Sequence, residues 1–188
     1  MILRGRWCNI IVLNVQAPKE EKSDDSKYSF YEELEQVFHH FPKYHMKILL
    51  WDFNAKVGRE NISKPTIGNE SLHQDTNDNG VRIANFATSK SLVVKRTMFL
   101  HWNIHKYTWT SPDGKTQNQI DHIVIDRRRQ SSILEVQSFR GADCDADHYL
   151  VVAKLRERLA VSEQAAQKFD MERVNLWKLL NELKVWKQ

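Results

Sequence analysis

The chain has 188 residues, a mass of 22.2 kDa and a net charge of +4, which suits one domain of ordinary size or a domain with a tail. With 41% apolar and 28% charged residues, it is not a collagen-like, low-complexity or strongly disordered chain. Two cysteines exclude a disulfide framework, and no long apolar window or signal-peptide pattern is present. We therefore expect no membrane contact and a nuclear or cytoplasmic protein that is not secreted.

The first half of the chain alternates apolar runs with a helical pattern. The runs at residues 7–16 and 46–51 each predict a buried strand. Apolar residues between them are spaced as in a helix: Phe30, Leu34, Val37, Phe38 and Phe41. Serines at 23 and 26 offer caps for this helix, and Pro42 ends it. Residues 52–79 are rich in Gly, Pro, Asn and Asp and predict a long loop, which in compact domains is usually functional or mobile.

The second half holds one more helix and most of the strands. Apolar residues at 81, 84, 86 and 87 predict a helix after the polar cluster at 77–80. Strands are predicted at 92–98, 106–110, 118–126, 132–139 and 149–155, with a hairpin turn at 111–115. Several strands with few helices indicate an α/β fold of packed sheets with helices outside. Residues 1–158 are the predicted domain, and 159–188 are a predicted linker and terminal helix.

Two polar residues follow the strand predicted at 46–51. Asp52 and Asn54 lie two positions apart, so their side chains point the same way in an extended chain. Polar residues just past a buried strand are where α/β folds place their sites. An ordinary turn, in which Asp and Asn bond local backbone groups, explains the pair as well and is favoured from the pair alone.

Further acids lie in or before later strands. Asp121 interrupts the apolar run at 120–125, and a buried carboxylate needs a partner, for which a histidine is a natural choice. His122 falls on the opposite face, so we expect Asp121 to face a site, unless it points to solvent from a one-sided strand. Asp147 and His148 precede the last strand, where they can bind a metal, contact a phosphate or exchange protons. An unremarkable pair in a loop is the default interpretation of these two.

Aromatic and basic residues are interleaved in the middle of the chain. The aromatic ones are Trp102, Tyr107 and Trp109, and the basic ones are His101, His105 and Lys106. This arrangement can stack on nucleotides, although alternate strand residues that fill a core are the commoner explanation. Residues 81–129 hold nine bases and three acids, whereas residues 19–35 hold three bases and seven acids. Such a distribution is typical of a site for polyanions, and random surface charge explains it equally well.

Taken in order, these motifs resemble the endonuclease/exonuclease/phosphatase superfamily. Its members have a Gly-Asp-Phe-Asn strand end, an acid in a late strand and a Ser-Asp-His motif. The matching stretches are LLWDFN at 49–54, NQIDHI at 118–123 and ADH at 146–148. Longer stretches, such as HKYTWTSPDGKTQNQIDHI, are similar to the endonuclease domain of RTE- or BovB-type non-LTR retrotransposons. The similarity covers about residues 5–160 and implies a β-sandwich flanked by helices.

The resemblance implies a role for each matching residue in the hydrolysis of DNA. Asp52 would orient or activate the attacking water, and Asn54 would hold the scissile phosphate. Asp121 would pair with His148, which would contact the phosphate and stabilise charge in the transition state. Asp147 would lie near a divalent metal bound by oxygen, Mg²⁺ or Mn²⁺. The expected DNA contacts are Trp109, Lys106, Arg127 and Arg128.

The chain also departs from the family pattern. The family has an Asn and a metal-binding Glu on strands that precede the strand beginning here at Trp7. Trp51 stands where the family has Gly, and Ala146 where it has Ser. We therefore expect a sandwich without its N-terminal strands, self-association through an open sheet edge at 7–16, and an impaired magnesium-dependent nuclease. The alternatives are a non-catalytic remnant that binds DNA or a protein, and a phosphatase or phosphodiesterase for small or lipid substrates.

Overall fold

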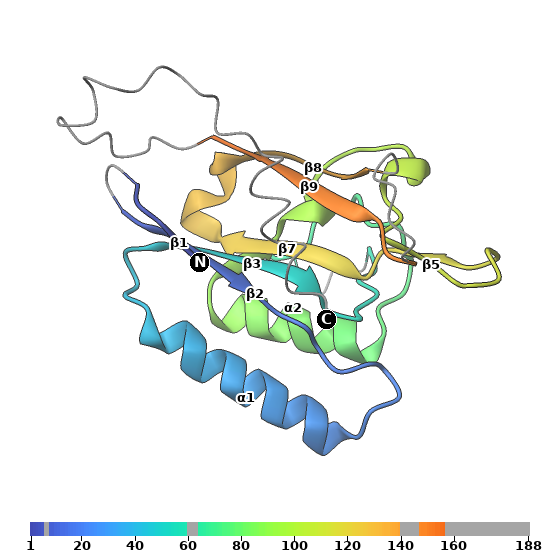
Figure 1. The fold of residues 1–188 in the computed structure, drawn as a ribbon, viewed down its shortest axis with the longest axis horizontal. Helices are drawn as coiled ribbons and strands as arrows, with labels where there is room; N and C mark the ends of the chain where they lie inside the picture. The colour runs from blue at the N-terminus through green and yellow to red at the C-terminus, as the bar shows by residue number, and fades with distance from the viewer. Residues whose placement is uncertain (6–7, 60–63, 140–146, 157–188) are drawn as a thin grey trace.

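The structure is a computed structural model that describes residues 1–5, 8–59, 64–139 and 147–156. Two helices, a five-stranded sheet and a two-stranded sheet lie in successive layers (Figure 1). The linker and terminal helix predicted at 159–188 lie outside the described residues. Within the described residues, no helix is long and apolar enough to cross a membrane. The predicted α/β class, with packed sheets and outer helices, is confirmed.

The central sheet has the strand order β1-β2-β3-β7-β4. Its strands are β1 (Ile2–Leu3), β2 (Ile10–Asn14), β3 (Met46–Asp52), β7 (Asp121–Asp126) and β4 (Leu92–Val94). The β2 and β3 strands are parallel, and the other neighbours are antiparallel. Because β3 and β7 are antiparallel neighbours in the middle of the sheet, the C-terminal end of β3 lies beside the start of β7.

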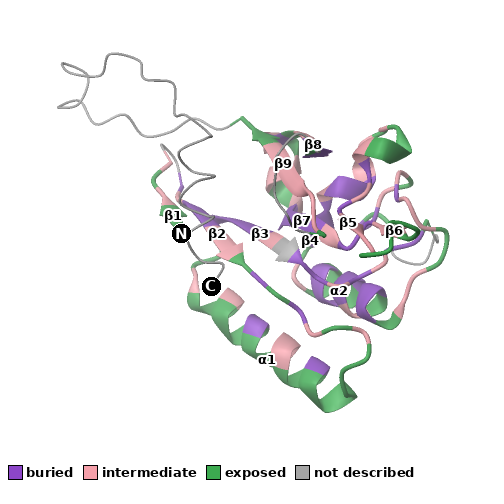
Figure 2. Cartoon of the chain, turned by 45° about the vertical axis from the view of Figure 1, so that its right-hand side comes forward, coloured by how far each residue is buried: buried purple, intermediate pink, exposed green. Residues whose placement is uncertain are grey.

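The two faces of this sheet are buried against different layers. Leu49 and Val124 belong to the core beneath the helices, whereas Ile48 and Ile123 belong to the core beneath the two-stranded sheet. This alternation follows from the period of two in a strand, and both faces are apolar because both are covered. Figure 2 shows the resulting burial of the central strands and of the inner face of α2. The nearly continuous apolar runs in the sequence therefore have a direct structural cause.

Helix α1 (Asp24–His40) matches the predicted helical spacing. Its N-cap Ser23 accepts a hydrogen bond from the backbone of Ser26, and the chain turns to an extended conformation at Phe41. Leu34 is buried, but Val37 is 46% exposed. The helix is thus confirmed, and Val37 lies beyond the apolar stripe that contacts the core although it shares the helical spacing.

Helix α2 (Asp78–Ser89) is also confirmed, and its start ties the long loop to the fold. The side chain of the N-cap Asn77 accepts hydrogen bonds from the N–H groups of Gly80 (2.8 Å) and Lys56 (2.9 Å). Its amide in turn donates to Glu20 at 2.8 Å. One cap therefore joins the helix, the loop that follows β3 and the segment that follows β2.

Gly80→Ala is expected to destabilise the protein although Ala favours helices. A Cβ at this position would lie 2.1 Å from the carbonyl oxygen of Lys56, so the loop or the helix would have to move. Overpacking of this kind costs about 1–3 kcal/mol, which exceeds the gain of about 1 kcal/mol in helix propensity. Thermal unfolding followed by circular dichroism measures the effect, with Val81→Ala at the exposed neighbouring position as control. A Gly80→Ala protein more stable than wild type would contradict the close approach.

The remaining elements agree with the prediction in type but differ in length. The strand predicted at 92–98 ends at Val94 and continues as a 3-10 helix, η2 (Lys95–Met98). The predicted hairpin is present as β5 (Trp109–Thr110) and β6 (Gln117–Asn118), and the second sheet pairs β8 (Ile133–Phe139) with β9 (Leu150–Leu155). Two further 3-10 helices are η3 (Asn103–His105) and η4 (Arg127–Ser132).

The outer edge of β2 is partly covered, which corrects one expectation. Leu3 and Ile2 pair with Ile10 and Ile11, and the Met1 backbone exchanges two 2.9 Å hydrogen bonds with Val12. The N-terminal residues thus occupy the donors and acceptors that were expected to be open over this stretch. Self-association through an open edge at Ile10–Val12 consequently has no support in the structure.

Candidate functional site

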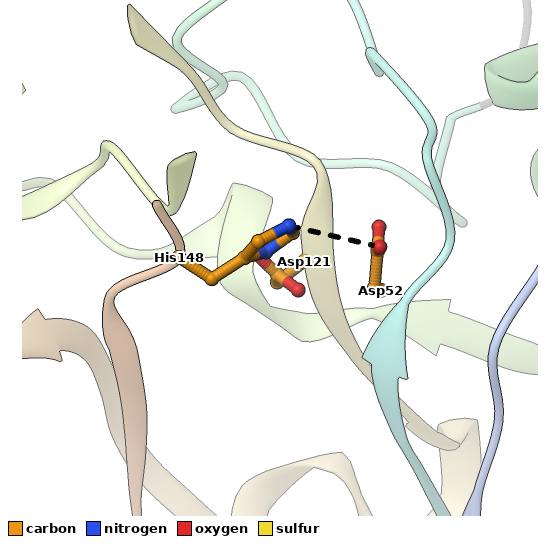
Figure 3. A group of neighbouring side chains, drawn as sticks. All are labelled: Asp52, Asp121 and His148. Carbon is orange, nitrogen blue, oxygen red and sulfur yellow. Dashed lines mark hydrogen bonds and ion pairs between the residues drawn. The ribbon is translucent and has the colours of Figure 1, made fainter. Parts of the chain in front are cut away.

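Three side chains from distant parts of the sequence meet beside the end of β3 and the start of β7 (Figure 3). Asp52 is the last residue of β3 and is paired in register with Asp121, the first residue of β7. His148 lies just before β9. Its Nδ1 is 3.2 Å from Asp121 Oδ2, and its Nε2 is 4.0 Å from Asp52 Oδ2. The histidine ring therefore lies with one nitrogen toward each carboxylate.

The electrostatics of this group couple the three ionisations. The pKa of His148 is raised, mainly by the hydrogen bond to Asp121 and against the effect of burial. The pKa of Asp52 is also raised, first by burial and then by repulsion from Asp121. A protonated histidine is therefore favoured here, and the negative charge of Asp52 is disfavoured unless a cation lies close to it.

The raised pKa of His148 predicts how stability changes with pH. The charged pair of His148 and Asp121 contributes fully below the ordinary histidine pKa of about 6.5, and this contribution is lost as pH rises through the raised folded-state pKa. Relative to His148→Gln, wild type should lose unfolding free energy as the pH rises above about 6.5. Urea unfolding at several pH values measures the difference, with exposed His40→Gln as control. A difference that stays constant or grows with pH would contradict the pairing.

The neighbouring His122 points away from this group, as the period of two predicts. It is 1% exposed, and its Nε2 donates to the carbonyl of Ala55 at 2.8 Å. Burial lowers its pKa to about 4, so the ring is neutral at physiological pH. The expectation that Asp121 and not His122 faces the site agrees with the geometry.

Asn54 shapes the backbone beside Asp52. It has a positive φ of 46°, and its N–H donates to Asp52 Oδ1 at 2.8 Å, which makes the local turn that the sequence also allowed. Its side-chain amide donates to the carbonyl of Ala17 at 3.0 Å. The buried Asn79 in turn donates to the carbonyls of Pro18 and Asn54. These bonds hold the segment after β2 against the site, and in this conformation the Asn54 amide is engaged by backbone.

Asp147 lies at the margin of the group. It is exposed, and its Oδ2 accepts a 2.8 Å hydrogen bond from the indole N–H of Trp109. Asp147 is close enough for its charge to raise the pKa of His148. Its carboxylate is not part of the close group of three. The sequence therefore located Asp147 near the site but did not reveal its contact with Trp109.

The basic residues expected to contact DNA lie elsewhere. Lys106 is 4% exposed, and its ammonium is 3.6 Å from Glu70, so it does not present its charge to a ligand. Arg127 and Arg128 follow the last residue of β7, about 20 Å along the strand from Asp121. Arg127 donates to Thr66, and Arg128 pairs with Asp126. The charge of Lys106 is thus not available to DNA, whereas contact of Arg127 and Arg128 with DNA away from the close group stays a prediction.

A polar network behind Asp121 was missed at the level of sequence. Gln119 is 1% exposed, and its Oε1 accepts hydrogen bonds from the backbone of Leu72 (3.0 Å) and the hydroxyl of Ser71 (3.3 Å). The backbone N–H of Gln119 donates to Nε2 of His73. Burial lowers the pKa of this histidine to about 4. The network fixes the long loop beside the start of β7. Gln119 lies among the polar residues of the motif at 118–123, so the sequence alone does not single it out.

The donor set fits a divalent cation that prefers oxygen. Within the described residues, Asp52, Asp121 and His148 form the group of possible metal ligands, with one ligand atom of each within 4.8 Å of the others. A cation near the carboxylates would also offset the burial and repulsion that raise the pKa of Asp52. Two carboxylates and one imidazole suit Mn²⁺ well, and carboxylate oxygens suit Mg²⁺.

Comparison with curated proteins finds relatives of this chain in two mammals. The chain is 35% identical over 166 residues to craniofacial development protein 2 of Bos taurus and to the same protein of Tragulus javanicus. The match covers 88% of this chain but only 28% and 29% of those proteins, so the chain spans less than a third of their length. No model of a known protein family matches the chain.

Solved structures of low sequence identity share the fold. The catalytic domain of Xenopus laevis APE2 has a TM-score of 0.54 at 18% identity, over 82% of this chain and 52% of that domain. The endonuclease domain of TRAS1, a telomere-specific non-LTR retrotransposon, has a TM-score of 0.51 at 12% identity, with 79% and 57% covered. The 3' phosphatase NExo from Neisseria, solved with a product DNA hairpin, has a TM-score of 0.53 at 18% identity, with 80% and 62% covered.

Proposed function

We propose that this chain, which has the fold of the endonuclease/exonuclease/phosphatase superfamily, hydrolyses phosphodiester bonds in DNA. The observation that carries the proposal is the convergence of Asp52, Asp121 and His148, with His148 held by one carboxylate and facing the other. The solved relatives with this fold include an endonuclease domain and a phosphatase bound to DNA, which supports a phosphate ester as substrate. The finer proposal is target nicking of the kind that starts reverse transcription in retrotransposons.

The arrangement gives each side chain a chemical task. His148, kept protonated by Asp121, donates a hydrogen bond from Nε2 to a phosphate oxygen and stabilises its developing negative charge. Asp52, whose raised pKa makes it a stronger base than an exposed carboxylate, accepts a proton from the attacking water. The 4.0 Å between His148 Nε2 and Asp52 Oδ2 is too long for a direct hydrogen bond, so both groups remain able to bind substrate or water.

Asp121, with Asp147 at the margin, would hold Mg²⁺ or Mn²⁺, which leaves Asp52 to act as the base. When bound, this ion would neutralise charge on the phosphate. No glutamate contributes to the close group among the residues described. We therefore propose slow turnover, since removal of one charge-stabilising contact typically costs on the order of 10²–10³ in rate.

Nicking of supercoiled plasmid tests the function. Purified chain at high concentration should slowly produce open circles in Mg²⁺ or Mn²⁺, and Asp52→Asn, which keeps the shape but removes the base, should not. The matched control is Asp25→Asn on the exposed side of α1. Equal background for wild type and Asp52→Asn would reject the nuclease. Salt-sensitive DNA binding without nicking would then favour the non-catalytic module, and release of phosphate from small esters would favour a phosphatase.

A further inference from the structure

We propose that Thr108, just before β5, and Trp109, its first residue, form a clamp that sets the alignment of Asp121 with His148. The inference rests on the proposed function, because it treats these two residues as positioning residues for that site. It also reassigns Trp109, which the sequence had identified as a surface for stacking bases. The clamp has one half on each side of the pair, and each half is a set of direct hydrogen bonds.

The first half is the hydroxyl of Thr108, which holds the start of β7. Thr108 is fully buried, and its Oγ1 accepts hydrogen bonds from the N–H groups of Ile120 (2.9 Å) and Asp121 (3.1 Å). The same hydroxyl donates to the carbonyl of Asn118 at 3.4 Å. A hydroxyl has one donor and two acceptor positions, so all of its capacity is used. The backbone of Asp121 is therefore fixed to the residue before β5 by a hydroxyl that an apolar side chain cannot replace.

The second half holds the segment that carries His148. The indole N–H of Trp109 donates to Asp147 Oδ2, and Trp109 pairs with His148 as an antiparallel bridge. Backbone bonds on both sides extend the contact, from Tyr149 N–H to the carbonyl of Thr108 (2.7 Å) and from Thr110 N–H to the carbonyl of Asp147 (2.9 Å). The residues before β9 are thus attached to Thr108, which holds Asp121, and to the two residues that follow it.

The clamp explains why a histidine and an aspartate 27 positions apart reach hydrogen-bond distance. Strands β7 and β9 are not paired with each other, and residues 108–110 bond both to the start of β7 and to the residues just before β9. Catalytic groups tolerate little displacement, since a misplacement of about 1 Å can cost about 10²-fold in rate. Loss of either half should therefore affect the pair more than it affects the fold as a whole.

The exposure of Asp147 separates this role from a merely structural one. A hydrogen bond to an exposed carboxylate adds little to stability because water replaces it when the fold opens. Trp109→Phe keeps an aromatic ring and the backbone bridge but removes the N–H donor. We expect this variant to retain the thermal stability of wild type within a few degrees while it loses the alignment of Asp147 and His148.

Proton NMR on the full chain tests both halves without added metal. The Trp109 indole proton, assigned by its absence in Trp109→Phe, should shift upfield in Asp147→Ala. At pH 6, the His148 Nδ1 proton that faces Asp121 should exchange with water roughly 2- to 10-fold faster in Thr108→Val and in Trp109→Phe, the factor that corresponds to one hydrogen bond. The controls are Trp102→Phe, at an indole that is 82% exposed, and Thr116→Val, at an exposed position.

The outcomes separate the clamp from the proposed function. If the chemical shift of the Trp109 indole proton is the same in Asp147→Ala as in wild type, the Trp109 half of the proposal is overturned. If the His148 Nδ1 proton exchanges at the wild-type rate in Thr108→Val, the Thr108 half is overturned. Where wild type nicks DNA, both variants should be slower by up to about 10²-fold, and the controls should match wild type. Where wild type does not nick, the nuclease proposal fails, while the two proton signals still support or overturn the clamp.

Discussion

His148→Ala is expected to reduce plasmid nicking by about 10²–10³-fold, to the background of buffer alone. The substitution removes the charged donor that Asp121 holds beside Asp52, and loss of one such donor to a developing oxyanion typically has this effect on the rate. Quantification of open circles over several hours, at equal protein concentration and in the same divalent ion, measures the loss. His148→Ala protein should remain folded, because the ring it lacks is partly exposed and belongs to neither apolar core.

Two comparisons make this result specific. His40→Ala, on the exposed end of α1, should nick at the wild-type rate. It controls for the general effect of removing a histidine from the chain. Asp121→Asn keeps the shape of the partner but removes its charge, so it should lower the rate less than His148→Ala does. Wild-type nicking by His148→Ala would reject the assignment of this site, whatever the activity of the chain.

The fold was predictable where one physical pattern dominated. Buried strands with both faces covered appear as unbroken apolar runs, so β2 and β3 were visible in the sequence. Helix spacing found α1 and α2 but did not show which apolar residues are buried, since Val37 and Val81 fit the spacing and are each 46% exposed. The spacing places apolar residues on one side of the helix. How many of them are buried depends on how closely the sheet approaches the helix, and the local sequence does not contain that distance.

The site was predictable in its members and less so in its contacts. The family resemblance identified Asp52 and Asp121 as members of the site. They lie together because Asp52 ends β3, Asp121 begins β7, and the two are paired in register. Lys106 was misjudged because exposure was inferred from charge, whereas its chain position turns it inward toward Glu70. Thr108 and Gln119 were overlooked since a neutral polar residue shows its importance only through the backbone groups that it contacts.

Phe53→Ala is expected to produce the largest loss of stability, about 3–5 kcal/mol. Phe53 is fully buried in the core between the central sheet and the helices, and it lies between the two candidate site residues of this segment, Asp52 and Asn54. Its removal leaves a cavity in a close-packed layer that also includes Leu49 and Val124. Since domains are stable by about 5–15 kcal/mol, the variant should unfold at much lower urea concentration.

Urea unfolding followed by circular dichroism measures the loss, with Phe139→Ala as the matched control at a phenylalanine that is 43% exposed. The control should change the unfolding free energy by far less, because its ring is already partly in water. Phe53→Leu should recover much of the loss by refilling the cavity. If Phe53→Ala were as stable as the control, the position of Asp52 would not depend on this core. The turn with Asn54, and the hydrogen bond from the Asn54 side-chain amide to the carbonyl of Ala17, would then hold the carboxylate in place.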